Sequence, residues 1–267
     1  MSDPHWTSQQ IERALTTAYV GRPVHYWPMI GSTMDEARRL AGAGAPEGTM
    51  VIADEQTAGR GRLQRSWWAP PASSLLLTLV LCPSLHPRQM GRLTMICSLA
   101  VCDAIACVSG VSAQVKWPND VLVGERKVCG ILTELGLLGD RLDYALVGIG
   151  INVNVDLGSA PPLMAPATSL QMETGRPLSR LDLLIHLLSG IEDRYEGLKA
   201  GQSFHPEWAG RMATLGRQVQ VAGGPEHWEG LATHIDEDGA LWIRLRDGCT
   251  RRILAGDVTL RSSEHGA

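Results

Sequence analysis

Three arginines and two glycines crowd into Gly59–Arg65, a segment we call the Arg/Gly loop, shortly after the apolar run Met50–Ala53. The whole chain carries a net charge of -4, so this loop concentrates positive charge locally. Neighbouring like charges repel, and they suit a place where an anion arrives to neutralise them. The planar guanidinium group of arginine binds phosphate or carboxylate through paired hydrogen bonds, and glycine lets the backbone approach such a ligand closely. The loop therefore predicts an anion-binding segment, with a solvated basic turn as the alternative.

A second polar motif, Lys116–Asp120, follows a short apolar run and reads Lys-Trp-Pro-Asn-Asp. Proline lacks a backbone donor, so Pro118 ends the predicted strand and leaves Lys116 at a rigid turn. A lysine held in this way is a fixed ammonium group rather than one that moves freely in solvent. Asn119 and Asp120 add polar groups, although such a pair often satisfies only the backbone of its own turn.

Glycines within two later strand patterns indicate where a ligand approaches the backbone closely. Gly130 follows Lys127, and Gly148 and Gly150 alternate with β-branched residues. A strand face without side chains opens a flat slot on the sheet, although a glycine in a strand also marks bulges. Lys127 has two interpretations, a second cation at the site or a solvated hairpin lysine.

These motifs together favour one site for a ligand with an apolar body, a carboxylate head and a phosphorylated partner. The Gly-x-Ser-x-Gly motif of many hydrolases is absent from the sequence. The phosphate-loop motif Gly-x-x-x-x-Gly-Lys-Ser/Thr and the dinucleotide motif Gly-x-Gly-x-x-Gly are absent as well.

The 267-residue chain has the composition of a soluble globular protein, with 44% apolar and 19% charged residues. Its pI near 6.1 argues against nucleic-acid binding through bulk charge. We expect no apolar run long enough to span a bilayer, and the N-terminus lacks the pattern of a signal peptide. The sequence therefore predicts a cytoplasmic protein without a membrane partner.

The six cysteines and the histidines show no metal-binding spacing, so we expect no structural metal. Cys97, Cys102 and Cys107 lie in an apolar segment and are interpreted as small core residues. Disulfides would be unusual in a reducing compartment.

Helical and strand patterns are mixed along the first two hundred residues, which predicts an α+β domain. Thr7 and Gln10 have the spacing of a capping box that opens a helix, and Thr33 and Glu36 have the same spacing before a second helix. The other expected elements are strands at 24–27, 49–55, 74–81, 113–117, 121–123, 127–137 and 142–151, with hairpin turns at Gly124 and Gly139, a long helix at 87–109, a loop at 157–167, and a helix that begins at Ser179.

The pattern changes near residue 212, where short alternating runs replace helices. Leu241–Leu245 alternates apolar and polar residues as a half-buried strand does, and Asp238-Gly239 is a tight-turn signal. We therefore expect a catalytic domain over 1–211 and a small β-barrel domain over 212–267.

The motifs that carry chemistry follow one another in a characteristic order. They are Ser32-Thr33, Gln56, the Arg/Gly loop with Trp67, Lys116–Asp120, Lys127 with Gly130-Ile131-Leu132 and Glu134, Gly148–Asn152, and Ala167-Thr168-Ser169-Leu170. In this order the chain resembles the biotin protein ligases, also called biotin–[acetyl-CoA-carboxylase] ligases, from about residue 25 to residue 262. Gly-Arg-Gly-Arg and Lys-Trp-Pro-Asn-Asp at this separation are highly specific for that family.

The resemblance implies an α+β fold: a mixed sheet with flanking helices, of the class II aminoacyl-tRNA synthetase-like or biotin–lipoate ligase type, followed by an SH3-like C-terminal barrel. It also implies a reaction in two steps. Biotin carboxylate attacks the α-phosphate of ATP and gives biotinyl-5′-AMP and pyrophosphate, with Mg²⁺ accompanying ATP. A lysine on the biotin carboxyl carrier domain of a carboxylase then takes the biotinyl group and releases AMP.

The resemblance further implies a role for each matched residue. Lys116, Arg60 and Arg62 are expected to be catalytic. Biotin is expected to contact Ser32, Thr33, Gln56, Gly59, Arg60, Arg62, Lys116, Gly130, Ile131, Gly148 and Gly150. ATP is expected to contact Arg62, Arg65, Trp67, Asn119, Lys127 and Asn152, with Trp67 packing either on the adenine or in the core.

Two residues depart from the family pattern. Gln64 stands where glycine is usual, so either the Arg/Gly loop follows a different path or Gln64 is strained. Met34 stands where asparagine is common, which puts one polar contact near biotin in doubt. We also expect the loop to be disordered without ligand and ordered with it, because it lacks apolar anchors.

Two other functions are compatible with these features. A lipoate–protein ligase shares the fold and the adenylating chemistry, but it generally lacks the Arg/Gly loop. A non-catalytic biotin-binding module is favoured only by Gln64. About 25 residues precede the matched segment, so we expect no DNA-binding domain and no nucleic-acid partner. The sequence leaves open which carboxylase is the acceptor and whether the chain is a monomer or a homodimer joined through a sheet edge.

Overall fold

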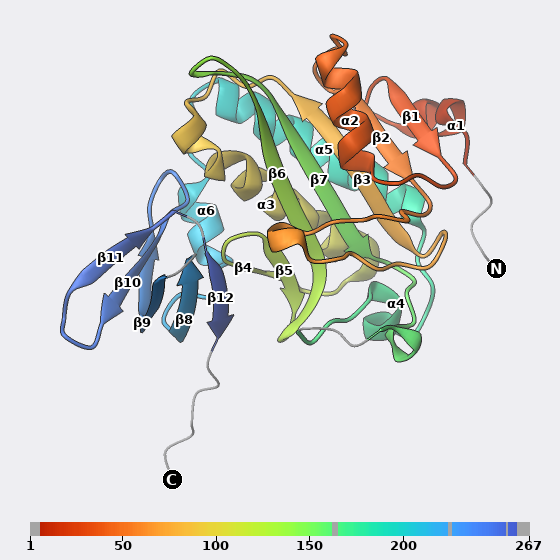
Figure 1. The fold of residues 1–267 in the computed structure, drawn as a ribbon. Coiled ribbons are helices and arrows are strands. Elements are labelled where there is room, and N and C mark those ends of the chain that lie inside the picture. The colour runs from red at the N-terminus through yellow and green to blue at the C-terminus, as the bar shows by residue number, and fades with distance from the viewer. Residues whose placement is uncertain (1–5, 162–164, 224–225, 255, 261–267) are drawn as a thin grey trace.

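The computed structural model describes residues 6–161, 165–223, 226–254 and 256–260. These residues form a seven-stranded sheet covered by helices and a separate five-stranded sheet near the C-terminus (Figure 1). The helices are α1 (Ser8–Ala14), α2 (Thr33–Gly42), α3 (Gly91–Ser109), α4 (Leu170–Thr174), α5 (Arg180–Lys199) and α6 (His205–Gly210). The strands are β1 (Val24–Trp27), β2 (Met50–Ala53), β3 (Ser74–Leu81), β4 (Gln114–Lys116), β5 (Asp120–Val123), β6 (Arg126–Leu138), β7 (Arg141–Asn152), β8 (Gln218–Gly223), β9 (Glu226–Ile235), β10 (Leu241–Leu245), β11 (Thr250–Ile253) and β12 (Asp257–Leu260).

The large sheet is mixed, with the strand order β1-β2-β3-β7-β6-β5-β4. β1 and β2 run parallel, and the other neighbouring strands run antiparallel. All eight residues of β3 are buried, as expected for a continuous apolar run at the centre of a sheet that is covered on both faces. The predicted α+β fold with a mixed sheet is thus confirmed.

The helices form layers on the two faces of this sheet. α3 and α5 pack against each other on one face, and α2 lies on the other (Figure 1). Within the described residues, the segment Pro87–Ser109 that contains α3 is long and apolar enough to cross a membrane, which corrects the expectation that no run reaches that length. Eleven of the nineteen residues of α3 are buried, so α3 is a core helix of this fold.

The two predicted capping boxes have different outcomes. Thr7 and Gln10 bond to each other as predicted, with Gln10 N donating to Thr7 Oγ1 at 3.2 Å and Thr7 N donating to Gln10 Oε1 at 2.9 Å. The box from Thr33 to Glu36 does not form, because Ser32 and not Thr33 is the N-cap of α2. The Thr33 amide instead donates to the side chain of Gln56 at 2.8 Å, which ties the start of α2 to the segment after β2.

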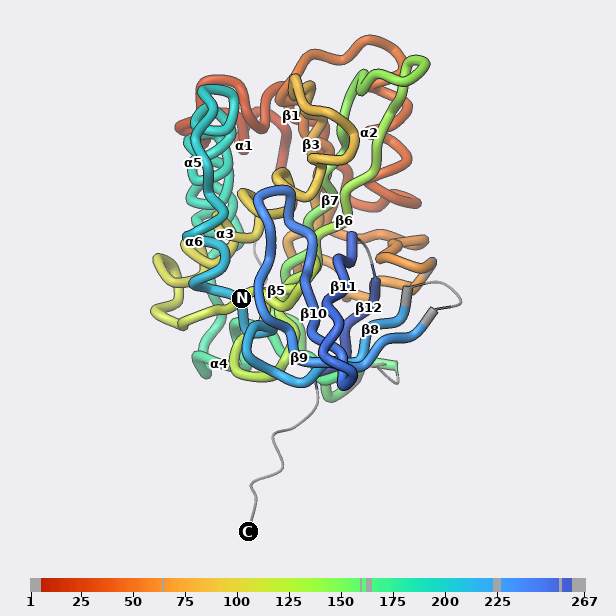
Figure 2. The backbone as a smooth tube through the Cα atoms, turned by 90° about the vertical axis from the view of Figure 1, so that its left-hand side faces the viewer, coloured from red at the N-terminus to blue at the C-terminus, as the bar shows by residue number. Residues whose placement is uncertain are grey.

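The C-terminal strands form an antiparallel sheet in the order β11-β10-β9-β8-β12, which confirms the small β-domain. Figures 1 and 2 show this sheet at one end of the molecule, beside β4, β5 and α6. The segment that leads into it, 211–214, runs along the outer edge of β4. There Val115 N donates to Arg211 O at 2.9 Å, and Ala213 N donates to Val115 O at 2.8 Å.

Other local expectations need correction. Cys97 and Cys102 are buried, but Cys107 is exposed on α3, where its sulfur lies 3.6 Å from Nε2 of His186 on α5. The loop predicted at 157–167 includes a short 3-10 turn at Leu157–Ser159, and its residues 162–164 lie outside the described residues. The five-residue α4 has no counterpart in the sequence predictions, because so short a helix shows no hydrophobic period.

Candidate active site

The Arg/Gly loop folds back on itself and lies over the same face of the sheet as α2 (Figure 1). Gly61 N donates to the carbonyl of Arg65 at 2.7 Å, and Trp67 N donates to the carbonyl of Gly59 at 2.9 Å. The left-handed backbone conformation falls on Leu63, with φ 54°, one residue before Gln64. The strain expected at Gln64 therefore falls on Leu63, whose side chain is exposed.

Two arginines of the loop form ion pairs with carboxylates of the same chain. Arg60 pairs with Asp35 on α2, and Arg65 pairs with Asp257 at the start of β12. All four side chains are between 35% and 48% exposed. Ion pairs this exposed contribute only about 0–1 kcal/mol, whereas arginine–phosphate contacts are charge-assisted and often bidentate. A phosphate group can therefore replace either carboxylate.

Arg62 is the more deeply placed arginine of the loop. Its guanidinium donates to the side-chain oxygen of Asn119 at 3.0 Å and to the carbonyl of Gly256 at 2.9 Å. Burial lowers the pKa of Arg62, and the positive charge of Arg65 acts in the same direction, while two aspartates oppose the shift. The loop is thus connected at this point both to the turn after β4 and to the C-terminal sheet.

Lys116 is half-buried at the end of β4, where it pairs in register with Asp120 at the start of β5. Burial lowers the pKa of its ammonium group, and the charges of Lys127 and Arg65 act in the same direction. The carboxylates of Asp120 and Asp257 oppose this shift. A partly desolvated cation among other cations attracts an incoming anion more strongly than a lysine in bulk water does.

The Asn119–Asp120 turn is fixed to the neighbouring hairpin. Asn119 Nδ2 donates to the carbonyl of Ile131 at 2.6 Å, and Ile131 N donates to the carbonyl of Asn119 at 2.9 Å. Lys127 Nζ lies 2.6 Å from Asp120 Oδ1 and 5.6 Å from the centroid of the Trp67 ring. The Ile131 side chain belongs to the core, so Ile131 supports the site through its backbone.

The glycine slot that the sequence predicts to be open is filled by side chains, so a ligand can enter it only if these side chains move. Gly130 and Gly150 are direct partners across β6 and β7. A Cβ atom on Gly150 would lie 2.8 Å from the Trp67 ring, and one on Gly148 would lie 2.8 Å from Met34 Cε. Trp67 therefore packs on the strands, and among the described residues its buried indole N–H has no hydrogen-bond partner. That donor is available to a ligand.

Three of the residues that are expected to contact biotin, Ser32, Thr33 and Gln56, lie together where α2 begins. Thr33 donates to Gln56 Oε1 from its amide at 2.8 Å and from its hydroxyl at 3.0 Å, and Ser32 is buried beside it as the N-cap. Thr78 on β3 donates to Thr33 Oγ1 at 2.9 Å and faces Gly148 in register. Thr78 was not among the residues predicted from the sequence, although a hydroxyl in the middle of the apolar run Leu75–Leu81 was a usable signal.

Asn152, at the end of β7, is buried, and its side-chain amide nitrogen donates to the carbonyl of Thr168 at 3.0 Å. Thr168 N in turn donates to the carbonyl of Lys127 at 2.8 Å. Asn152 therefore fastens the segment before α4 to the hairpin that carries Lys127. Its expected contact with ATP remains a prediction.

A buried ion pair that the sequence analysis did not identify supports the segment behind the Arg/Gly loop. Arg180, the first residue of α5, donates to Asp54 Oδ1 at 2.8 Å, and both side chains are almost completely buried. Tyr26 donates its hydroxyl to Asp54 Oδ2 at 2.6 Å, and the Trp6 ring packs against the guanidinium, 4.3 Å from its centroid. These contacts hold the end of β2, from which Gln56 and the loop continue.

Comparisons with known proteins give matches over both sheets of the chain. The sequence profile of the biotin/lipoate A/B protein ligase family matches residues 26–152, and that of the biotin protein ligase C-terminal domain matches residues 214–261. The chain is 36% identical to a biotin–[acetyl-CoA-carboxylase] ligase of Paracoccus denitrificans, over 80% of this chain and 90% of that protein. It is 33% identical to the bifunctional ligase/repressor BirA of Bacillus spizizenii, over 95% of this chain and 79% of that protein. A structure of biotin protein ligase from Aquifex aeolicus in complex with biotin and ATP superposes with a TM-score of 0.75 at 30% identity, covering 90% of this chain and 99% of that one.

Proposed function

The chain belongs to the biotin protein ligases, and from this premise we propose that it activates biotin with ATP and transfers it to a carboxylase. Biotin and ATP react to give biotinyl-5′-AMP and pyrophosphate, and a lysine of a biotin carboxyl carrier domain then receives the biotinyl group. The ligase named among its relatives and the biotin and ATP bound in the Aquifex structure support this reaction. The chain's own site supports it through one observation: Lys116, Arg62 and Arg65 lie together beside the Asn119 turn, which is bonded to the glycine-bearing strand β6.

The first step brings two anions into contact, and this is where the cations act. Unit charges about 4 Å apart repel by roughly 4 kcal/mol at an effective dielectric near 20. Lys116 is the group that we assign to bridge the biotin carboxylate and the α-phosphate. Arg60 and Arg62 bind phosphate and carboxylate oxygens once their present partners, Asp35 and the Gly256 carbonyl, are displaced.

We place biotin and ATP at opposite ends of the glycine slot. We assign the ureido ring of biotin to the hydroxyls and amide at Ser32, Thr33 and Gln56, which lie beside Thr78. The apolar body of biotin then lies along the strands near Gly148 and Met34, where a thioether suits a hydrocarbon surface better than the usual asparagine does. ATP occupies the other end, near Trp67.

Magnesium is expected to enter with ATP. Among residues that the structure describes, no group of three or more His, Cys, Asp or Glu side chains is placed to hold a metal ion. Mg²⁺ would be held mainly by the phosphate oxygens of ATP and by water, because the carboxylates near Lys116, Asp120 and Asp257, are ion-paired with Lys127 and Arg65. Bound with ATP, Mg²⁺ would supply positive charge that stabilises the departing pyrophosphate.

A measurement of pyrophosphate release tests the proposed function. The protein is incubated with ATP and biotin, then with ATP and lipoate, and then with ATP alone. Release that requires biotin supports the ligase. Release with lipoate in place of biotin would assign the chain to lipoate ligation, and no release in any mixture would indicate a non-catalytic binding module.

A further inference from the structure

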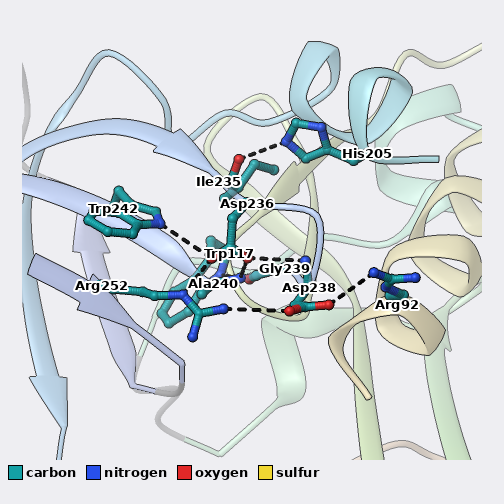
Figure 3. Close-up of polar contacts among 10 residues, drawn as sticks. All are labelled: Arg92, Trp117, His205, Ile235, Asp236, Asp238, Gly239, Ala240, Trp242 and Arg252. Atoms are coloured by element: carbon teal, nitrogen blue, oxygen red, sulfur yellow. Dashed lines mark hydrogen bonds and ion pairs between the residues drawn. The ribbon is translucent and has the colours of Figure 1, made fainter. Parts of the chain in front are cut away.

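One turn of the C-terminal sheet reaches the strand that carries Lys116. The turn between β9 and β10, residues 236–240, lies against the start of α3 and against Trp117, the residue after Lys116 (Figure 3). Trp117 is 1% exposed, and its indole Nε1 donates to the carbonyl of Gly239 at 2.8 Å. A side chain next to Lys116 is therefore held by the backbone of the other sheet.

Hydrogen bonds from its own backbone and from Arg252 hold the turn, and with it the Gly239 carbonyl, in place. Asp236 Oδ1 accepts from the amides of Asp238 at 3.1 Å and Ala240 at 3.0 Å, and Asp236 Oδ2 accepts from Arg252 Nε at 2.6 Å. Burial raises the pKa of Asp236, but hydrogen bonds from Arg252, the Ala240 amide and the Trp242 indole outweigh it and lower the pKa overall. Gly239 closes the turn with φ +87°, a conformation that favours glycine.

The turn is also fastened to the large domain. Asp238 lies between Arg92 of α3, at 3.1 Å, and Arg252 of β11, at 3.7 Å (Figure 3). A Cβ atom on Gly91 would lie 2.2 Å from the Asp238 carbonyl, so glycine is needed at the start of α3 for this close approach. On the other side, His205 Nε2 of α6 lies 2.7 Å from the carbonyl of Ile235.

The backbone around Lys116 has further bonds to the same part of the chain. Trp117 N donates to Thr214 Oγ1 at 2.9 Å, and Thr214 is fully buried. The hydrogen bonds of Val115 to segment 211–214 cover the outer edge of β4. The three residues of β4 pair on their other side only with β5, so much of the restraint on Lys116 comes from segment 211–214 and the 236–240 turn.

We propose that the Trp117–Gly239 hydrogen bond is a positioning contact through which the C-terminal sheet sets the place of the Lys116 ammonium group for adenylation. Trp117 touches no substrate in this scheme and acts through Lys116. The proposal rests on the proposed function, because it concerns the residue assigned to bridge carboxylate and phosphate. A displacement of about 1 Å in such a group is enough to cost on the order of 100-fold in rate.

The test compares two identical substitutions, Trp117→Phe and Trp208→Phe. Both indoles are buried and each donates one hydrogen bond, Trp208 to Ser98 Oγ at 2.9 Å. Trp208 also packs near the same turn, since a Cβ atom on Gly239 would lie 3.6 Å from its ring. The two variants therefore lose similar packing and one donor each, but only Trp117 adjoins Lys116.

Biotin-dependent ATP–pyrophosphate exchange is measured for both variants, together with Tm. We expect Trp117→Phe to lower kcat by on the order of 10- to 100-fold while the KM for biotin and the KM for ATP change by less than about threefold, because the contact serves the transition state. Trp208→Phe should keep kcat near the wild-type value at a comparable loss of Tm. Equal kcat in the two variants, or a change confined to KM, would overturn the proposal.

A second pair of variants decides the question if Trp117→Phe does not fold. Asp238→Asn removes the charge that fastens the turn to Arg92, and Glu237→Gln makes the same change at the exposed neighbour in the same turn. We expect kcat to fall by on the order of 3- to 10-fold in Asp238→Asn alone. An unchanged kcat in Asp238→Asn refutes the positioning role. Wild-type exchange is measured first, because its absence would refute the proposed function rather than this inference.

Discussion

The chemistry assigned to Lys116 depends on where its charge is held. The ammonium group is half-buried at a strand end, and it shares its surroundings with Lys127 and Arg65. Bringing several cations together costs free energy in the empty site, and an anionic ligand returns that free energy on binding. The cations therefore stabilise the transition state, in which the biotin carboxylate and the α-phosphate are in contact, more than they stabilise either anion alone. Such preferential stabilisation is the condition for catalysis.

Lys116→Ala removes this charge and should lower the rate of biotin-dependent adenylation by about 10²- to 10³-fold, the scale for the loss of one preorganised charge-stabilising donor. The measurement is biotin-dependent ATP–pyrophosphate exchange. Lys199→Ala serves as the control, because Lys199 lies at the end of α5, on the other face of the sheet. Near-normal exchange in Lys116→Ala would remove Lys116 from the mechanism.

Gly150→Ala tests the glycine slot. The added methyl group would lie 2.8 Å from the Trp67 ring, so the ring must move away from the strands. We expect the KM for ATP to rise by on the order of tenfold, since we assign Trp67 to the nucleotide end of the slot. Gly42→Ala is the matched control, because nothing lies within 4 Å of a Cβ atom there. A KM for ATP that is unchanged in Gly150→Ala would argue against this assignment of Trp67.

At the residue scale, the sequence identified the groups that carry charge or lack a side chain, because residue type alone reveals them. Gly148, Gly150, Lys116 and the arginines were found in this way. Thr78 and the pair Asp54 and Arg180 were not, because their roles depend on which strands and helices meet in space. Arg180 in particular has the sequence context of an ordinary helix N-terminus, yet it is fully buried.

At the scale of elements, the Glu192 carboxylate on α5 binds the backbone of residues 18–20, which are distant in the sequence. Glu192 accepts hydrogen bonds from the backbone amides of Ala18 at 2.8 Å, Tyr19 at 2.9 Å and Val20 at 2.9 Å. Burial raises the pKa of Glu192, but the three amides outweigh this effect and the pKa is lowered overall. The segment between α1 and β1 is thereby fixed to the helix layer.

The stability that Glu192 contributes should depend on pH with a definite sign. Its folded-state pKa lies below the unfolded value of about 4.3, so the contribution is present above that pH and is lost as the pH falls through the folded-state pKa. We expect Glu192→Gln to lower the free energy of unfolding by about 1–2 kcal/mol at pH 7, and by less at about pH 3.5.

Urea denaturation at the two pH values measures this difference. Asp193→Asn, at the exposed neighbour on the same helix, is the control for a general effect of removing negative charge. A Glu192→Gln difference that stays constant or grows as the pH falls would contradict the assignment.

Element types were predictable where a long apolar pattern sets them, as in β3 and α3. The ends of elements were less predictable, because there the backbone groups can bond either within the element or to side chains from distant segments. The Thr33 amide prefers the side chain of Gln56 to a capping box, and Gln56 arrives from a segment more than twenty residues away. Similarly, the left-handed residue of the Arg/Gly loop proved to be Leu63, since the closure of the loop and not the missing glycine decides which residue takes that conformation.

At the scale of the whole molecule, the Arg/Gly loop connects the two sheets. Arg62 bonds to Gly256, just before β12, and Arg65 pairs with Asp257 at the start of β12, while the loop itself leaves the large sheet after β2. The order of the motifs predicted both domains, but no sequence pattern places β12 against this loop. The contact depends on the tertiary arrangement, and it places the small β-domain beside the proposed site.

The loop should become more protected when both substrates bind, because its arginines exchange weak ion pairs for phosphate contacts. Trypsin cleaves after arginine, and we expect cleavage at Arg60, Arg62 and Arg65 to slow by on the order of tenfold with biotin and ATP together, since cleavage follows the open population. Digestion followed by mass spectrometry locates the cuts, with biotin alone and ATP alone as controls. Equal cleavage rates with and without both substrates would show that the loop does not close.

The most direct measurement of the central claim follows the bond that the site is proposed to make. The wild-type protein is mixed with biotin and ATP labelled at the α-phosphate, and the reaction is quenched with acid within a single turnover. We predict labelled biotinyl-5′-AMP in an amount close to that of the enzyme, and its conversion to AMP when a carboxylase carrier domain is added. Label that stays in ATP, or an adenylate that forms equally well with lipoate in place of biotin, would contradict the account.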